Sequence, residues 1–201
     1  MSEAIFPYRP PLLMGSVGRR ASGYWGAVFL VLSEASIFAY LCFAYFYFAV
    51  QPHPGPWPPA GPPSFTYTAP QTIVILASCV AAWFAERAAA RAEPAALLVA
   101  LGLNLALGAG FIALQFLDWY DKPYALATEP HASLYYVITG VHLAHVVLGM
   151  IMLAAVTLWS VLGYLGPVRH VPVTVAKLYW YFLAIVWLAL FFTLNITPYL
   201  T

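Results

Sequence analysis

The stretch YWGAVFLVLSEASIFAYLCFAYFYFAV, residues 24–50, decides the fold, because it is apolar from end to end and carries a single charged side chain, that of Glu34. About 20 apolar residues in a helix cross the hydrocarbon core of a bilayer. A helix also satisfies its own backbone polar groups, which a segment surrounded by lipid requires. We therefore predict a membrane-spanning helix over residues 24–50.

The rest of the chain has the same character. Of its 201 residues, 63% are hydrophobic and only 7% are charged, whereas an ordinary soluble domain has about 25% charged residues. This composition excludes a soluble globular domain and a disordered chain. The net charge of +1 gives no reason to expect a nucleic-acid partner. Further apolar runs without strand-like alternation follow at 67–90, 94–117, 132–163 and 174–198.

We predict an all-α fold, an integral membrane bundle of five transmembrane helices that forms one domain over residues 24–201, preceded by a polar cytoplasmic tail at 1–23. The basic residues predict its orientation, because they gather on the cytoplasmic side of membrane proteins. The N-terminus is therefore expected to be cytoplasmic and the C-terminus periplasmic. With alternating spans, one side holds Lys122 and the N-terminal side holds Arg9, Arg19, Arg20, Arg87, Arg91, Arg169 and Lys177.

Small and polar residues predict how the helices pack. Small residues at four-residue spacing let helix backbones approach closely in lipid, and we expect two such ridges to face the inside of the bundle. The ridges are Ala77, Ala81, Ala85 and Ala89 in one span and Gly102, Ala106 and Gly110 in the next. We expect hydrogen bonds between helices from Asn104, Gln115 and Asn195. Asp118 and Asp121 are expected to be solvated at the external boundary. The proline-rich connection 51–70 is either a rigid turn or a docking surface.

Glu34, His142 and His145 are the candidate functional residues inside the membrane. At 1.5 Å per residue, Glu34 lies about 15 Å from the cytoplasmic end of its span. His145 lies about 20 Å from the outer end of the span at 132–163, so the two are at comparable depths. An intramembrane carboxyl group is costly and usually functional. We predict that Glu34 hydrogen-bonds to one of the two histidines, in either a functional or a purely structural role.

The sequence disfavours a metal or haem site. Two histidines at i,i+3 suit a carboxylate-rich di-iron site, but Glu34 is the only inward carboxylate available. A haem held by two histidines would need a second histidine on another span, whereas His53, His131 and His170 lie in loops or at span ends. We predict no cofactor and no metal in this chain.

Several motifs together resemble one family, subunit III of the haem–copper oxidases of the cytochrome c oxidase type. They occur in the family's order, from residue 24 to residue 198, and include the family's buried glutamate, its Trp-Pro-Pro loop and its pattern TGxHxxHVxxG. The matching stretches are LSEASIFAYLCFAYFYF (32–48), WPPAG (57–61), TIVILAS (72–78), LQFLDWYD (114–121), TGVHLAHVVLG (139–149) and YWYFLAIVWLALF (179–191).

The resemblance places Glu34, His142, His145 and Asp118 at the family's polar positions. It is to the short, five-helix form, because the usual seven-helix members have two helices before the one that matches 24–50. The last helix also differs. Tyr181 and Ala184 stand where the family commonly has His and Asp, so a polar cluster that uses those two groups is not expected here.

The resemblance implies a cofactor-free subunit in a bacterial inner (plasma) membrane. Subunit I, which it would pack against and stabilise, would hold haem and copper, and subunit II would accept electrons from cytochrome c. Support of proton uptake, bound phospholipid and contacts with further respiratory subunits are also implied. Two alternatives remain open. One is a companion of a quinol oxidase or nitric oxide reductase, and the other is a small proton or solute transporter that uses Glu34 and His145.

Overall fold

The computed structural model describes residues 22–52, 57–165 and 170–200. Each of five helices in this part is long and apolar enough to cross a membrane, as predicted. Residues 1–21, most of the predicted N-terminal tail, lie outside the described residues, as does His53. The helices are α1 (Ser22–Ala49), α2 (Thr68–Ala90), α3 (Pro94–Tyr120), α4 (Pro130–Val161) and α5 (Val171–Phe191), the last continued by a π-helical turn (Phe192–Ile196) and a 3-10 turn (Thr197–Tyr199).

Local sequence explains where several helices begin and end. Pro94 and Pro130 open α3 and α4, where a missing backbone N–H leaves no hydrogen bond unmade. Gly163 follows the end of α4 with a φ of +73°, a left-handed conformation that glycine adopts without strain. The predicted spans at 94–117 and 132–163 are therefore confirmed, with ends that shift by a few residues.

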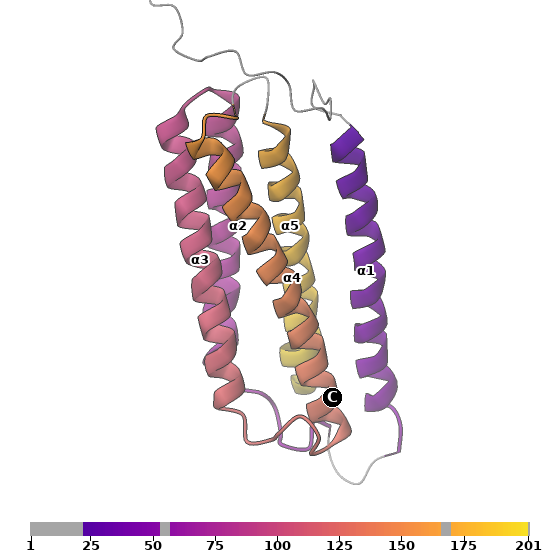
Figure 1. Cartoon of the computed structure of the whole chain (residues 1–201). Helices are drawn as coiled ribbons and strands as arrows, with labels where there is room; N and C mark the ends of the chain where they lie inside the picture. The colour runs from indigo at the N-terminus through magenta and orange to yellow at the C-terminus, as the bar shows by residue number, and fades with distance from the viewer. Residues whose placement is uncertain (1–21, 53–56, 166–169, 201) are drawn as a thin grey trace, which may run out of the picture.

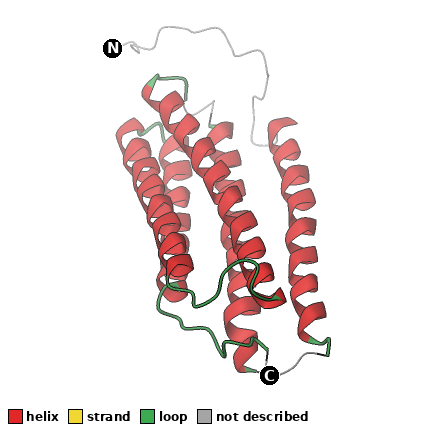
Figure 2. Cartoon of the chain, turned by 60° about the horizontal axis from the view of Figure 1, so that its bottom comes forward, coloured by secondary structure: helices red, strands yellow, loops and turns green. Residues whose placement is uncertain are grey.

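The helices run alternately up and down, and α1 lies at one edge of the bundle (Figure 1). The α2–α3 pair forms a hairpin, and α5 packs against α1, α2 and α4. α1 packs against α4 and α5. The connections after α1 and after α3 gather at one end, which Figure 2 brings forward. Within the described residues, α1 therefore packs on the bundle mainly along the side that faces α4 and α5.

Trp180 of α5 fills the centre of the bundle, and its indole lies close to glycines on two neighbouring helices. A Cβ at Gly149 of α4 would lie 3.1 Å from the indole, and a Cβ at Gly108 of α3 would lie 3.0 Å from it. Trp180 is 1% exposed, and its Nε1 donates a hydrogen bond of 2.7 Å to the hydroxyl of Ser78 on α2. Three helices thus meet around one side chain.

One predicted packing ridge lies inside the bundle and the other does not. On α2, Ala81, Ala85 and Ala89 are buried, which confirms that ridge apart from Ala77, which is exposed. On α3 the prediction is wrong, because Gly102 and Ala106 are exposed and a Cβ at Gly102 or Gly110 would meet none of the described residues within 4 Å. The buried face of α3 is instead the one that carries Leu101, Asn104, Gly108 and Phe111.

Candidate functional site

Glu34 of α1 and His145 of α4 form the predicted contact inside the membrane. The Oε2 atom of Glu34 lies 2.9 Å from Nε2 of His145, which confirms the predicted hydrogen bond and selects His145 over His142. The two side chains are 25% and 17% exposed, so the pair sits at the flank of the bundle. It is a polar link between the edge helix and the rest of the protein.

The hydrogen bond of the second ring nitrogen of His145 determines how many protons the Glu34–His145 pair shares. Nδ1 of His145 lies 2.7 Å from the backbone carbonyl of Val141. Because a carbonyl oxygen only accepts, Nδ1 carries a hydrogen. The remaining bond to Glu34 then holds one proton, as a carboxylic acid beside a neutral imidazole or as a carboxylate beside an imidazolium. Both forms have zero net charge, which suits a pair facing lipid or a protein partner.

His142 has a different environment from its neighbour on α4. It is 0% exposed, and its Nε2 lies 3.1 Å from the backbone carbonyl of Leu183 on α5. Its Nδ1 is buried without a hydrogen-bond partner among the described residues. Phe38 of α1 packs against both imidazoles, with ring centroids 6.1 Å from His142 and 5.0 Å from His145. Glu34 therefore meets one histidine, and the other is a core residue that holds α4 to α5.

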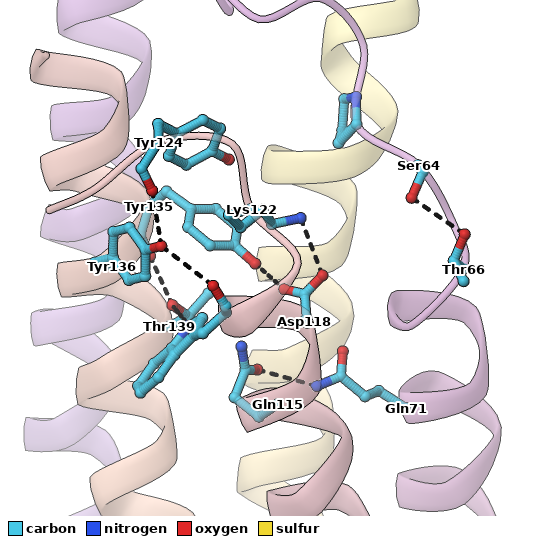
Figure 3. Close-up of polar contacts among 12 residues, drawn as sticks. Ser64, Thr66, Gln71, Gln115, Asp118, Lys122, Tyr124, Tyr135, Tyr136 and Thr139 are labelled. Atoms are coloured by element: carbon cyan, nitrogen blue, oxygen red, sulfur yellow. Dashed lines mark hydrogen bonds and ion pairs between the residues drawn. The ribbon is translucent and has the colours of Figure 1, made fainter. Parts of the chain in front are cut away.

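Asp118 lies in a buried polar cluster near the C-terminal end of α3 (Figure 3). It is 2% exposed, its Oδ1 is 2.9 Å from Nζ of Lys122, and its Oδ2 accepts a hydrogen bond from the hydroxyl of Tyr135 on α4. The prediction of a solvated Asp118 is wrong, because Lys122 and the start of α4 cover it. Asp121 is exposed, as predicted.

The loop after α3 also belongs to this cluster. Tyr136 donates a hydrogen bond of 3.0 Å to the backbone carbonyl of Tyr124 (Figure 3). Burial, with the Asp118 carboxylate nearby, holds the pKa of the Tyr124 phenol well above its usual value. Trp119 donates to the hydroxyl of Thr139 at 3.1 Å. These contacts tie the loop and the ends of α3 and α4 together.

The predicted hydrogen bonds between helices have different outcomes. Gln115 of α3 accepts a hydrogen bond of 3.1 Å from the amide of Gln71 on α2, which confirms that prediction. Asn104 is 0% exposed, but its amide oxygen and nitrogen have no hydrogen-bond partner among the described residues, so the prediction for Asn104 is wrong. Asn195 is buried. The sequence correctly predicts that these polar residues are buried, but it does not predict whether a hydrogen-bond partner lies opposite them.

Sequence reasoning missed an ion pair and a loop contact. Lys177 of α5 pairs with Glu86 of α2. Glu86 lies near the end of α2 and Lys177 near the start of α5, so their similar depth in the membrane was the signal that could have predicted the pair. In the connection 51–70, the Trp57 ring lies 5.8 Å from the ring of Tyr45 and 5.2 Å from that of His131. This part of the loop therefore packs on the bundle.

The described residues bring no three His, Cys, Asp or Glu side chains close enough together to hold a metal ion.

The fold and the Glu34–His145 contact define a class of multi-pass helical membrane proteins with a carboxyl–imidazole pair between two spans. A sequence model of the family described as cytochrome c oxidase subunit III matches residues 19–198. The chain belongs to this family, and the resemblance seen in its motifs is confirmed.

Individual relatives agree with this assignment. The chain is similar to "Cytochrome c oxidase subunit 3" of Synechocystis sp., with 31% identity over 195 residues, which is 94% of this chain and 82% of that protein. It is also similar to "Cytochrome c oxidase subunit 3" of Danio rerio, with 31% identity over 173 residues, 83% of this chain and 66% of that protein. The matched part thus covers slightly under two thirds of the fish protein's length.

Proposed function

We propose that this chain is a cofactor-free subunit of a haem–copper oxidase complex, of the kind that reduces O₂ to water with electrons from cytochrome c. The observation that carries the proposal is the family match over residues 19–198. In the proposed complex, subunit I binds this chain directly and holds the haem and copper, and subunit II receives the electrons. Asp118 acts within this chain as a buried polar anchor.

The proposed contribution of this chain is to stabilise subunit I and to support proton uptake. Glu34 and His145 support this role, because they join the edge helix α1 to α4 through one shared proton. A subunit that must hold a large apolar surface in a fixed place benefits from such a polar link in lipid. Glu34 is therefore proposed as a polar anchor near subunit I, and His142 as the core residue beneath it.

The proposed orientation places the start of α1 in the cytoplasm and the end of α5 in the periplasm of a bacterial inner membrane. The charges support it. Arg87, Arg91 and Lys177 lie toward the end of the bundle where α1 begins, and Lys122 lies toward the other end. This asymmetry follows the rule that basic residues gather on the cytoplasmic side.

Purification of the tagged chain in a mild detergent tests the proposal. The co-purifying chains are identified, and a reduced-minus-oxidised spectrum is recorded. We expect haem bands and a haem–copper subunit, together with a copper-binding subunit if cytochrome c is the donor. A chain that purifies alone, and that conducts protons when reconstituted into vesicles, would contradict the proposal and favour a transporter.

A further inference from the structure

A hollow of about 360 Å³ lies between α2 and α3, next to the turn that joins them. Small residues form its floor, including Ala88 on α2 and Ala96 and Ala100 on α3, and larger apolar side chains such as Trp83 form its sides. A methyl side chain at each floor position leaves the space open. The hollow is therefore an apolar groove on the membrane-facing side of a helical hairpin.

The groove has the length of one bilayer leaflet. Its lining on α2 extends from Arg91 at the end of the helix to Ala81, a distance of about 15 Å at 1.5 Å per residue. Half of a hydrocarbon core of about 30 Å is the same length. An acyl chain that enters at the polar end of the hairpin would therefore lie along the groove to the middle of the membrane.

The mouth of the groove carries net positive charge. Arg87 and Arg91 line it one helical turn apart, and Glu93 is the acidic residue beside them. Both arginines are exposed, and within the described parts of the chain no ion pair involves either of them. The Arg87 guanidinium lies 5.0 Å from the centre of the Trp83 ring, which holds it at the edge of the groove. Two guanidinium groups at this spacing suit the oxygens of a phosphodiester.

We propose that this groove binds a phospholipid of net negative charge, with its phosphate between Arg87 and Arg91 and one acyl chain along Ala88 and Ala100. The groove and its arginines carry the proposal, which requires only that the hairpin spans a membrane. It does not depend on assembly with an oxidase. Because the two arginines outweigh the single Glu93 at the mouth, a headgroup of net negative charge is favoured over a zwitterionic one.

Native mass spectrometry of the full chain in detergent tests the site. Dioleoyl phosphatidylglycerol and dioleoyl phosphatidylcholine, which share the same acyl chains, are titrated separately. We expect one phosphatidylglycerol to bind at least about tenfold more tightly, because each basic residue near an anionic headgroup contributes severalfold. Equal affinity for the two lipids, or a second copy of the chain bound in place of lipid, would overturn the proposal.

Matched variants locate the binding. Ala96→Leu fills the groove, whereas Ala106→Leu makes the same change at an exposed position of the same helix that does not line it. We expect the first to abolish the preference and the second to keep it. The double change R87Q/R91Q should also abolish it, and Glu93→Gln should strengthen it by removing the opposing charge. A Glu93→Gln variant with weaker phosphatidylglycerol binding, or identical results for the two leucine variants, would refute the site.

Discussion

The carboxyl group of Glu34 and the imidazole of His145 lie 2.9 Å apart and connect α1 to α4. They come from segments that are 111 positions apart in the sequence, and at equal depth they leave neither polar group unpaired in the membrane. Because Nδ1 of His145 is committed to the Val141 carbonyl, the shared bond has one proton and no net charge. This relationship makes the attachment of α1 testable.

Replacing Glu34 separates hydrogen bonding from charge. Glu34→Ala removes the bond, and we expect it to destabilise the protein by about 0.6–1.7 kcal/mol, the range for hydrogen bonds between membrane helices. Glu34→Gln should retain most of the stability, because its amide can donate to Nε2 of a neutral His145. Thermal unfolding in detergent measures both. Full thermal stability of Glu34→Ala would show that the pair does not hold α1.

The glycines around Trp180 should be intolerant of a methyl group. We expect Gly149→Ala to cost about 1–3 kcal/mol, because its Cβ would lie 3.0 Å from Leu183 and 3.1 Å from Trp180. Gly102→Ala is the control on α3, where a Cβ meets no atom of the described chain within 4 Å, and alanine there should be neutral or stabilising by about 0.5–1 kcal/mol. Unfolding temperatures in detergent compare them. The opposite order would contradict the packing.

The Asp118–Lys122 pair should be sensitive to loss of either partner. The side chains are 3% and 10% exposed, and removing one partner of a buried ion pair costs about 3–5 kcal/mol. We therefore expect Lys122→Met to be strongly destabilising. The double variant D118N/K122M should recover part of the loss, since no unpaired charge is left. A single variant as stable as the wild type in chemical or thermal unfolding would show that the cluster is solvated.

Asn104 and Gln115 give opposite predictions for the same change. Asn104→Leu removes a buried amide that has no hydrogen-bond partner among the described residues, so we expect a gain in stability of about 1–3 kcal/mol. Gln115→Leu leaves the Gln71 amide without its partner and should destabilise by a similar amount. Thermal unfolding of both variants decides this. A loss of stability in Asn104→Leu would mean that the amide binds a group such as buried water.

Hydropathy predicts the spans because the membrane imposes one solution on an apolar chain, a helix about 20 residues long. Depth along two such helices then predicts that Glu34 meets one of the two histidines, and the structure selects His145. The buried face of α3 could not be predicted in the same way, because small residues occur on two of its faces. Met150 and Trp180 distinguish the two faces, because both would crowd a Cβ at Gly108, whereas no described residue comes within 4 Å of a Cβ at Gly102 or Gly110.

The surroundings of Asp118 lay beyond sequence reasoning for another reason. A charge at the end of a span is normally solvated. The spacing of apolar residues along a helix does not show how the loop after the helix folds back onto it. Lys122 folds back onto Asp118, and Tyr135 reaches it from the start of α4. Burial at a helix end is therefore a property of the loop and the next helix together.

If redox chemistry belongs to the partner chains, haem must stay with them when the complex dissociates. The complex is purified through a tag on this chain, then treated with a harsher detergent, and visible absorbance is measured in each separated fraction. We expect every haem band to leave with the partner chains and the tagged chain to retain none. A haem band that stays with the isolated chain would contradict it.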